Sequence, residues 1–312
     1  MARNKKPSLI HQVVERLKMM DCRGQSRHKA KKEYREKLEA RGEKMVGNRV
    51  PGKIFSELTF KNYLDRCCNF VRWAQKEYGV RTLEEIERRH KEIVNKYIDY
   101  LETDKSPYTI HGYVSAISML LGTKNGDYEL PQKSYNDITK NRIDPDAQIE
   151  GFDNEKHADL VRFIKATGLR RIELCRIRPE QVVKNIWGDV CIYIMPNQAK
   201  GGRPRIVHPI KEDAEWVYQY AREQQRKGKK RIFSVKDGEI PKRAPCHPLR
   251  AVFAERKYTE ALKTHATGEI YRRRGDKREF DKGALQVVSD NMGHNRLGIC
   301  VQNYLWRNES ED

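Results

Sequence analysis

The second half of the chain places cationic side chains at the edges of apolar patterns. Arg170 stands at an expected helix start in "TGLRRIEL", and Lys200 stands at the bend of "PNQAKGGRP". His247 and Arg250 lie three positions apart in "CHPLR", so both project from one face of a helix. Arginine binds phosphate well because its planar fork pairs with two oxygens at once. These residues therefore indicate a phosphate site.

Two residues near the C-terminus add a second imidazole and a nucleophile. His294 follows "NMG", and Tyr304 comes ten positions later in "GICVQNYLW". A tyrosine can attack a phosphodiester and keep the bond energy in a covalent intermediate. Its unperturbed pKa of about 10 requires help from nearby cations, and a mobile lysine can give the leaving oxygen its proton. The chain has no H-E-x-x-H, paired-carboxylate or Walker motif, so the set suits phosphodiester attack without a metal ion or other cofactor.

Composition points to the same class of partner. The chain has 312 residues and a formal net charge of +19, which makes a polyanion such as DNA the expected partner. No apolar run approaches the roughly 20 residues of a membrane span, and the N-terminus lacks the apolar stretch of a signal peptide. The 7 cysteines are scattered and form no C-x-x-C pair, which fits a reducing cytoplasm without disulfides or structural zinc.

The first half is expected to be helical. Residues 1–48 are predicted to form a charged helical N-terminal arm, solvated or ordered only on DNA, and "GNRVPGK" (47–53) to form a break. Three helical patterns follow: one carries Phe60 to Val71 on one face, one opens at Thr82 and extends to Leu101, and one opens at Ser106. They predict a helical domain over 49–124, and the polar stretch 125–150 is typical of a linker.

The second half, 151–312, is expected to be a mixed domain. The apolar runs 189–195 and 205–210 flank the two glycines after Lys200 and predict a β-hairpin, with 231–235 as a third strand. Helices are expected around 154–166, 212–226, 247–264, 280–292 and 297–307, and 271–283 is expected to be a solvated loop. The fold class is therefore mainly α with a small antiparallel β-sheet, in two domains.

The ordered set of motifs resembles the tyrosine recombinase family of phage integrase type. The matching stretches are "TGLRRIEL", "AKGGRPRIVHPI", "HPLR", "MGH" and "VQNYL", which together span about 155–306. Each motif is weak alone, and the specificity lies in their order. The preceding helical domain looks like the family's core-binding domain, so the resemblance implies a two-domain clamp around duplex DNA. The gap between His294 and Tyr304 is one residue longer than is usual in the family.

The resemblance also implies a role for each matching residue. Arg170 and Arg250 would hold the scissile phosphate, and His294 would hydrogen-bond one of its oxygens. Lys200, with Arg203 as the alternative, would protonate the leaving 5′-hydroxyl. In addition, His247 would assist proton transfer at the nucleophile, Tyr304 would form the 3′-phosphotyrosyl link, and Glu173 would brace the site through Arg170. The resemblance further implies double-stranded DNA as partner, a homo-tetramer on DNA, and accessory DNA-bending or directionality factors.

Simpler interpretations stand beside these roles. Arg170 could form a surface ion pair with Glu173, Lys200 could be an ordinary turn lysine, and Tyr304 could be a core aromatic with Tyr258 or Tyr271 as the nucleophile. At the level of function, we expect a mobile-element integrase located in the cytoplasm at the nucleoid. The alternatives are a type IB-like topoisomerase and a DNA-binding regulator that has lost catalysis.

Overall fold

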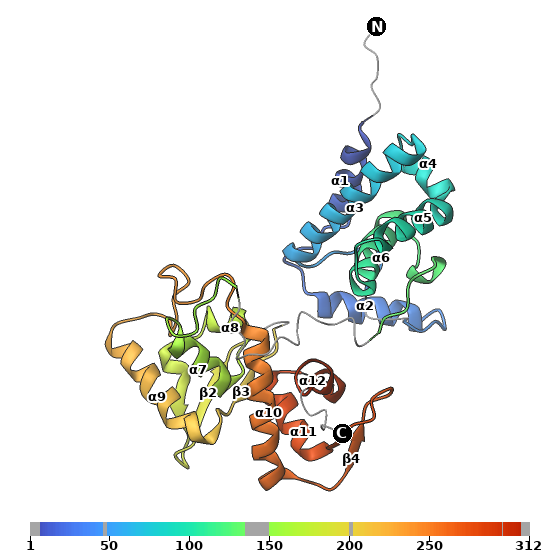
Figure 1. The fold of residues 1–312 in the computed structure, drawn as a ribbon. Coiled ribbons are helices and arrows are strands. Elements are labelled where there is room, and N and C mark those ends of the chain that lie inside the picture. The colour runs from blue at the N-terminus through green and yellow to red at the C-terminus, as the bar shows by residue number, and fades with distance from the viewer. Residues whose placement is uncertain (1–6, 46–48, 135–149, 200–201, 295, 307–312) are drawn as a thin grey trace. The chain divides into compact units, whose positions relative to one another are not determined.

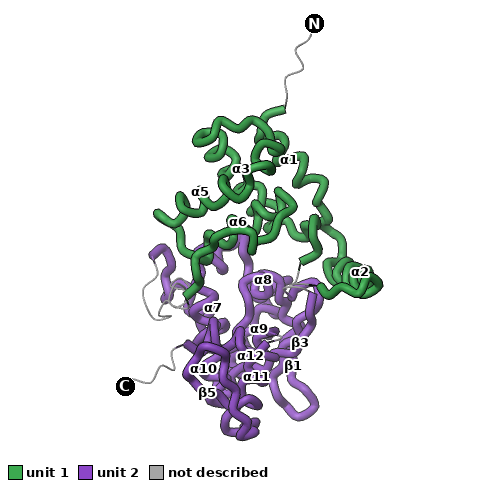
Figure 2. The backbone as a smooth tube through the Cα atoms, turned by 90° about the vertical axis from the view of Figure 1, so that its right-hand side faces the viewer, with its two compact units in different colours: residues 1–137 green, residues 138–312 purple. Residues whose placement is uncertain are grey.

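The computed structural model of the chain describes residues 7–45, 49–134, 150–199, 202–294 and 296–306. It is mainly helical with small antiparallel sheets, which confirms the predicted fold class (Figure 1). The chain divides into two compact units, Met1–Asp137 and Ile138–Asp312 (Figure 2). Their boundary falls within the expected linker 125–150, most of which lies outside the described ranges. No helix in these ranges is long and apolar enough to cross a membrane.

Unit 1 is helical in its described part. Its elements are α1 (Leu9–Met19), α2 (Arg27–Glu39), α3 (Glu57–Tyr78), α4 (Leu83–Arg88), α5 (His90–Glu102), α6 (Pro107–Leu121) and the 3-10 turn η1 (Asn125–Asp127). Ser56 caps α3 by accepting a hydrogen bond from the Thr59 amide at 3.2 Å. Thr82, a predicted helix start, accepts one from the Glu85 amide at 3.2 Å. Ser106, the other predicted start, precedes α6 without a side-chain cap hydrogen bond to any described residue. The pattern that opens at Thr82 is two helices instead of one, because the backbone at Arg89 leaves the helical region.

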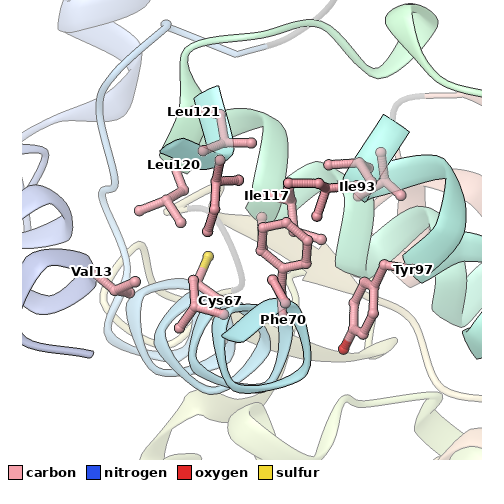
Figure 3. Packing of buried hydrophobic residues seen from close by; sticks show 14 of the residues in the cluster. Val13, Cys67, Phe70, Ile93, Tyr97, Ile117, Leu120 and Leu121 are labelled. Atoms are coloured by element: carbon pink, nitrogen blue, oxygen red, sulfur yellow. The ribbon is translucent and has the colours of Figure 1, made fainter. Parts of the chain in front are cut away.

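Helix α1 packs into the same core as the later helices of unit 1. Leu9, Val13 and Leu17 recur every four residues along α1, and all three are buried. Figure 3 shows Val13 facing the core that also holds Cys67 and Phe70 of α3. Part of the segment expected to be a solvated arm, 1–48, is therefore structural, because its apolar face needs the partners that α3 and α6 supply.

Unit 2 is built around one long central helix. Its elements are α7 (Ala158–Thr167), α8 (Arg171–Leu174), η3 (Pro179–Gln181), β1 (Val182–Lys184), β2 (Val190–Ile194), β3 (Arg205–Val207), α9 (Lys211–Arg226), α10 (Cys246–His265), β4 (Ile270–Arg272), β5 (Glu279–Asp281), α11 (Lys282–Met292) and α12 (Leu297–Asn303). Helix α10 packs on α7 on one side and on α11 on the other (Figure 1). Leu249 joins the core of α7, α9 and the sheet, whereas Phe253 joins the core of α11 and α12.

The three-stranded sheet has the order β1-β2-β3, all antiparallel. The hairpin of β2 and β3 is confirmed, with Ile192 opposite Val207. The third strand is β1, and the prediction of a strand at 231–235 was wrong. Ile232 and Phe233 are buried there, but the segment is irregular, with the Ile232 amide donating to the Ile177 carbonyl. An apolar run reports burial and does not by itself report strand pairing.

The segment 271–283 also differs from its prediction as a solvated loop. Strands β4 and β5 pair in it, with Tyr271 opposite Phe280. Phe280 is buried against Tyr258 of α10 with ring centroids 5.7 Å apart. One aromatic residue therefore anchors an otherwise polar hairpin to the core of α10 and α11.

Candidate active site

Arg170 is placed by the sharp end of helix α7. Gly168 ends α7 in the left-handed region at φ +61°, and a Cβ there would lie 2.2 Å from the Phe253 ring. Leu169 is fully buried, and Arg170 follows in extended conformation as the residue before α8. Only glycine fits this turn, because it alone tolerates both the backbone angle and the close approach of Phe253. The turn thereby fixes where the guanidinium of Arg170 starts.

His247 and Arg250 come from the first turn of α10, one above the other. Arg250 is only 2 % exposed, and its guanidinium donates to the Gly168 carbonyl, which joins the start of α10 to the end of α7. The Nδ1 atom of His247 is buried and has no hydrogen-bond partner among the described residues. A buried polar atom without a partner is costly, so this nitrogen is suited to a group supplied by a ligand.

His294 sits in a turn that several hydrogen bonds hold. Gly293 ends α11 at φ +67°, and the His294 amide then donates to the Ser289 carbonyl at 2.8 Å. The Ser289 hydroxyl donates to the His294 carbonyl at 3.1 Å, and Arg170 Nη2 donates to the Gly293 carbonyl at 3.0 Å. The Nε2 atom of His294 is buried and, within the described ranges, also lacks a partner.

Tyr304 lies between these groups, directly after α12. Its ring stacks on His247 with centroids 4.7 Å apart and planes 12° apart, and its centroid is 5.4 Å from that of His294. Its hydroxyl is 3.5 Å from Arg250 Nη2, and the Arg250 Cζ lies 5.3 Å from the ring centroid. Tyr304 is 5 % exposed. The structure thus brings a phenol against a guanidinium and two imidazoles that the sequence separates by up to 57 positions.

Glu173 contacts Arg170 as expected, but its main partner is a residue that the sequence analysis did not select. Its side chain is fully buried, and it accepts from Arg170 Nη1 at 3.1 Å and from the Arg170 amide at 2.7 Å. Arg205 of β3 pairs with both carboxylate oxygens, Nη1 to Oε1 and Nη2 to Oε2, each at 2.8 Å. A signal was present: Arg205 and the buried Val207 share one face of β3, so an arginine occupies a core-facing strand position.

Three other cationic residues, Lys200, Arg203 and Arg171, differ in what the structure shows of their surroundings. Lys200, the predicted general acid, lies outside the described residues, and its alternative Arg203 is exposed. Arg171, the neighbour of Arg170, is partly buried and donates to the Pro241 carbonyl at 2.7 Å and the Ile240 carbonyl at 3.2 Å. Arg171 is thus occupied by backbone carbonyls, which separates its role from that of Arg170.

Burial and the arginines control ionisation in the site. Burial, followed by the charge of Arg250, lowers the pKa of His247 to about 4. Burial and the charges of Arg170, Arg250 and Arg205 lower the pKa of His294 to about 3. Burial alone would raise the pKa of Glu173, but the hydrogen bonds and charge of Arg205 outweigh it and hold the pKa below its usual range. Both imidazoles are therefore neutral at neutral pH, and Glu173 is an anion.

The rival tyrosines have other contacts. The Tyr258 hydroxyl accepts a hydrogen bond from the Asp281 amide at 2.8 Å, and burial raises the pKa of this phenol. Tyr271 lies in β4, and its hydroxyl lies close to Gly298 at the start of α12. A Cβ added to Gly298 would be 3.0 Å from this hydroxyl. No group of three or more His, Cys, Asp or Glu side chains in the described ranges is arranged to hold a metal ion.

The comparisons with known proteins give distant structural likenesses. No protein-family model and no curated protein matches the chain. It is similar to the XerH site-specific recombinase bound to palindromic difH substrate, with 16% identity and TM-score 0.45 over 78% of this chain and 74% of that one. It is also similar to XerA recombinase (17% identity, TM-score 0.30, 82% and 89%) and to the Tn1549 transposon integrase bound to transposon right end DNA (14%, TM-score 0.35, 77% and 94%).

Proposed function

We propose that this chain is a tyrosine recombinase, an enzyme that cleaves and rejoins DNA strands through a covalent 3′-phosphotyrosyl link. The observation that carries the proposal is the position of the Tyr304 hydroxyl, 3.5 Å from Arg250 Nη2, with its ring against both His247 and His294. A phenol beside the Arg250 guanidinium is placed to attack a phosphate that the same guanidinium holds. The arrangement joins nucleophile, charge stabilisation and proton acceptors in one buried site.

In the proposed reaction Arg170 and Arg250 bind the non-bridging oxygens of the scissile phosphodiester. The Tyr304 oxygen attacks phosphorus, its proton passes to the neutral His247, and the bond from phosphorus to the 5′ oxygen breaks. Lys200 gives the leaving 5′ oxygen its proton, and His294 donates a hydrogen bond to a phosphate oxygen. The reverse sequence, with a 5′-hydroxyl of another strand as attacker, rejoins the DNA and frees Tyr304. No nucleotide is consumed, because the phosphotyrosine retains the energy of the bond.

A bound phosphate changes the ionisation of the imidazoles in the useful direction. In the free protein burial, and after it the positive charge of the arginines, holds the pKa of both His247 and His294 low. A phosphodiester between those arginines brings a negative charge that offsets theirs, which raises both pKa values. His247 therefore becomes a better proton acceptor when DNA occupies the site. Its pKa rises only in the complex in which it accepts the proton of Tyr304.

The proposed substrate is duplex DNA, and the proposed role is integration or excision of a mobile element by a homo-tetramer, with accessory DNA-bending or directionality factors. The net charge of +19 supports DNA as partner, since neutralising phosphates releases counterions and drives binding. Exchange between two duplexes requires several active sites acting together, which supports an oligomer on DNA. Work on such DNA would place the protein in the cytoplasm at the nucleoid.

The test is covalent trapping. The protein is mixed with labelled nicked duplexes tiled across the DNA around its own gene, and adducts are resolved on a denaturing gel beside Tyr304→Phe. We expect a wild-type adduct that the variant lacks. A two-site exchange assay then separates recombination from the relaxation of site-free plasmid that a topoisomerase would give. Tight binding to these duplexes with no adduct would instead support a DNA-binding regulator without catalysis.

A further inference from the structure

Arg205 occupies the centre of a buried ion cluster, and the proposed chemistry gives this residue no role. The Arg205 side chain is 7% exposed and that of Glu173 is 0% exposed, and they form a bidentate pair. Arg170, at 17% side-chain exposure, contacts the same carboxylate with one guanidinium nitrogen, Nη1, and with its backbone amide. Arg205 thus makes two guanidinium hydrogen bonds to the carboxylate and Arg170 makes one, although Arg170 is the one of the two that would bind the proposed phosphate.

This sharing affects how strongly Arg170 can hold an anion. A buried carboxylate attracts any cation beside it more strongly than it would in water, because the surroundings screen little. If Arg205 were missing, Glu173 would have Arg170 as its remaining cationic partner among the hydrogen bonds the structure records. Arg170 would then be drawn toward Glu173, and its charge would be offset before a phosphate arrived. With Arg205 present, the carboxylate is already compensated.

Arg205 also fixes the turn that carries His294. Its Nε donates to the Asn291 carbonyl at 2.8 Å, while Arg170 Nη2 donates to the Gly293 carbonyl at 3.0 Å. The Asn291 side chain in turn accepts from the His208 amide at 2.7 Å, just beyond β3. Arg205 of β3 therefore binds both Glu173 of α8 and the end of α11. Loss of Arg205 removes these contacts and leaves the His208–Asn291 hydrogen bond as the remaining link described here between the strand and the turn.

We propose that Arg205 is a positioning residue that neutralises Glu173, so that Arg170 stays available for the phosphate, and holds the turn that places His294. The proposal rests on the proposed function of the site. It makes a specific claim about direction: without Arg205, the negative charge of Glu173 becomes harmful, and removing that charge should restore part of the activity.

The test compares Arg205→Met, Glu173→Gln and the double variant with wild type, all checked for folding by circular dichroism and thermal melting. Arg256→Met is the matched control. Arg256 of α10 also pairs with carboxylates, those of Glu212 and Asp213 at the start of α9, but it makes no contact with Glu173 or Arg170 in the ion pairs recorded for the described residues. The rate of adduct formation is measured at saturating DNA and normalised to folded protein. We expect Arg205→Met to lower it by about 100-fold with little change in Kd for DNA, and the double variant to recover about tenfold of that loss. Arg256→Met should keep the wild-type rate.

The outcomes separate a positioning role from a merely structural one. A structural role would lower the melting temperature of Arg205→Met but leave the rate per folded molecule unchanged, which would overturn the proposal. A double variant slower than Arg205→Met would overturn the claim about Glu173. A second readout needs no DNA: imidazole NMR signals of His294 at pH 7.5 should shift in Arg205→Met and remain in place in Arg256→Met. If wild type forms no adduct, the proposed function fails, and the NMR comparison still decides whether Arg205 positions His294.

Discussion

At the scale of single residues, the site works by geometry that only arginine can supply. Arg250 reaches the Gly168 carbonyl with one nitrogen and the Tyr304 hydroxyl with another. A lysine would keep the charge, but its donors all lie on one nitrogen, so it lacks the two separate nitrogens with which Arg250 makes these two contacts. The fork of Arg250 therefore determines both the position of α10 relative to the turn and the surroundings of the nucleophile.

We predict that Arg250→Lys lowers the single-turnover rate of adduct formation by about 100- to 1,000-fold, because one donor to the developing charge is lost. Affinity for DNA should change little, since most binding comes from other phosphate contacts. Arg171→Lys is the control, because Arg171 donates to the backbone of Ile240 and Pro241 and not to Tyr304. An Arg250→Lys enzyme as fast as wild type would contradict the assignment of this residue.

The two imidazoles predict how stability depends on pH. His247 and His294 have folded-state pKa values of about 4 and about 3, whereas both titrate near 6.5 in an unfolded chain. Between about pH 6.5 and 4 the unfolded chain binds protons that the folded protein does not, so stability is present above this window and is lost as pH falls through it. Each histidine should contribute on the order of 1 kcal/mol per pH unit.

Urea unfolding at pH 7.5, 6.5 and 5.5 measures this slope in the absence of DNA. Replacing both histidines, His247→Gln with His294→Gln, should flatten it, whereas His265→Gln, at an exposed position, should not. If the double variant loses stability with acid as steeply as wild type, the two imidazoles are not the buried neutral groups described above.

The candidate residues of the site could be chosen from sequence, apart from one. Arg170, His247, Arg250, His294 and Tyr304 stand in short motifs whose order is informative, and the structure places them around one point. Arg205 lies in the matched stretch "AKGGRPRIVHPI", where only its core-facing strand position distinguishes it. Its importance depends on a carboxylate 32 positions away, and that contact exists only once β3 and α8 are packed together.

At the scale of elements, turns and helix ends place the reactive groups. Gly168 illustrates how tightly: its carbonyl accepts from Arg250, Arg170 follows two residues later, and the Phe253 ring fills the space where a side chain would stand. The sequence predicted a helix that ends near residue 166, but it could not reveal the contact of Gly168 with Phe253, which comes from another helix.

We predict that Gly168→Ala destabilises the protein by about 2–4 kcal/mol, through the left-handed backbone and the clash with Phe253. Gly228→Ala is the matched control, because Gly228 has φ +69° and an added Cβ would meet nothing within 4 Å. It should cost only about 1–2 kcal/mol for the backbone. Equal losses of unfolding free energy in the two variants would show that the Phe253 contact does not matter.

Elements with polar surroundings were harder to predict than the helices. The strands β4 and β5 carry one buried aromatic, Phe280, so their alternation is faint and the sequence predicts a loop there. The segment 231–235 shows the opposite error: the sequence predicts a strand where the backbone is irregular. Ile232 and Phe233 are apolar and buried there, but their backbone does not pair with a strand in the described ranges. Local patterns record which side chains are buried. Whether a backbone pairs depends on a neighbouring strand, which local sequence patterns do not contain.

At the scale of the whole molecule, charge and site serve different steps. The net charge of +19 acts through exposed groups that salt screens, whereas Arg250 and Arg205 are buried and are screened much less. Every described residue of the candidate site lies in the unit 138–312. Binding and chemistry should therefore respond differently to ionic strength.

We predict that affinity for duplex DNA falls steeply with salt, by roughly 1,000-fold or more between about 50 and 200 mM for six or more phosphate contacts. The rate of adduct formation at saturating protein should change only a few-fold over the same range. Fluorescence anisotropy gives the first quantity and a quenched trapping reaction gives the second. A cleavage rate that falls in parallel with affinity would mean that exposed charges take part in the chemical step.

The most direct test of the account is to locate the covalent bond. Trapped adduct is digested with nuclease and trypsin, and the nucleotide-bearing peptide is identified by mass spectrometry. We predict a nucleotide on the peptide 297–307, "LGICVQNYLWR", whose single tyrosine is Tyr304. A nucleotide on the peptides that contain Tyr258 or Tyr271 would contradict the assignment of the nucleophile, and with it the roles given to the groups around Tyr304.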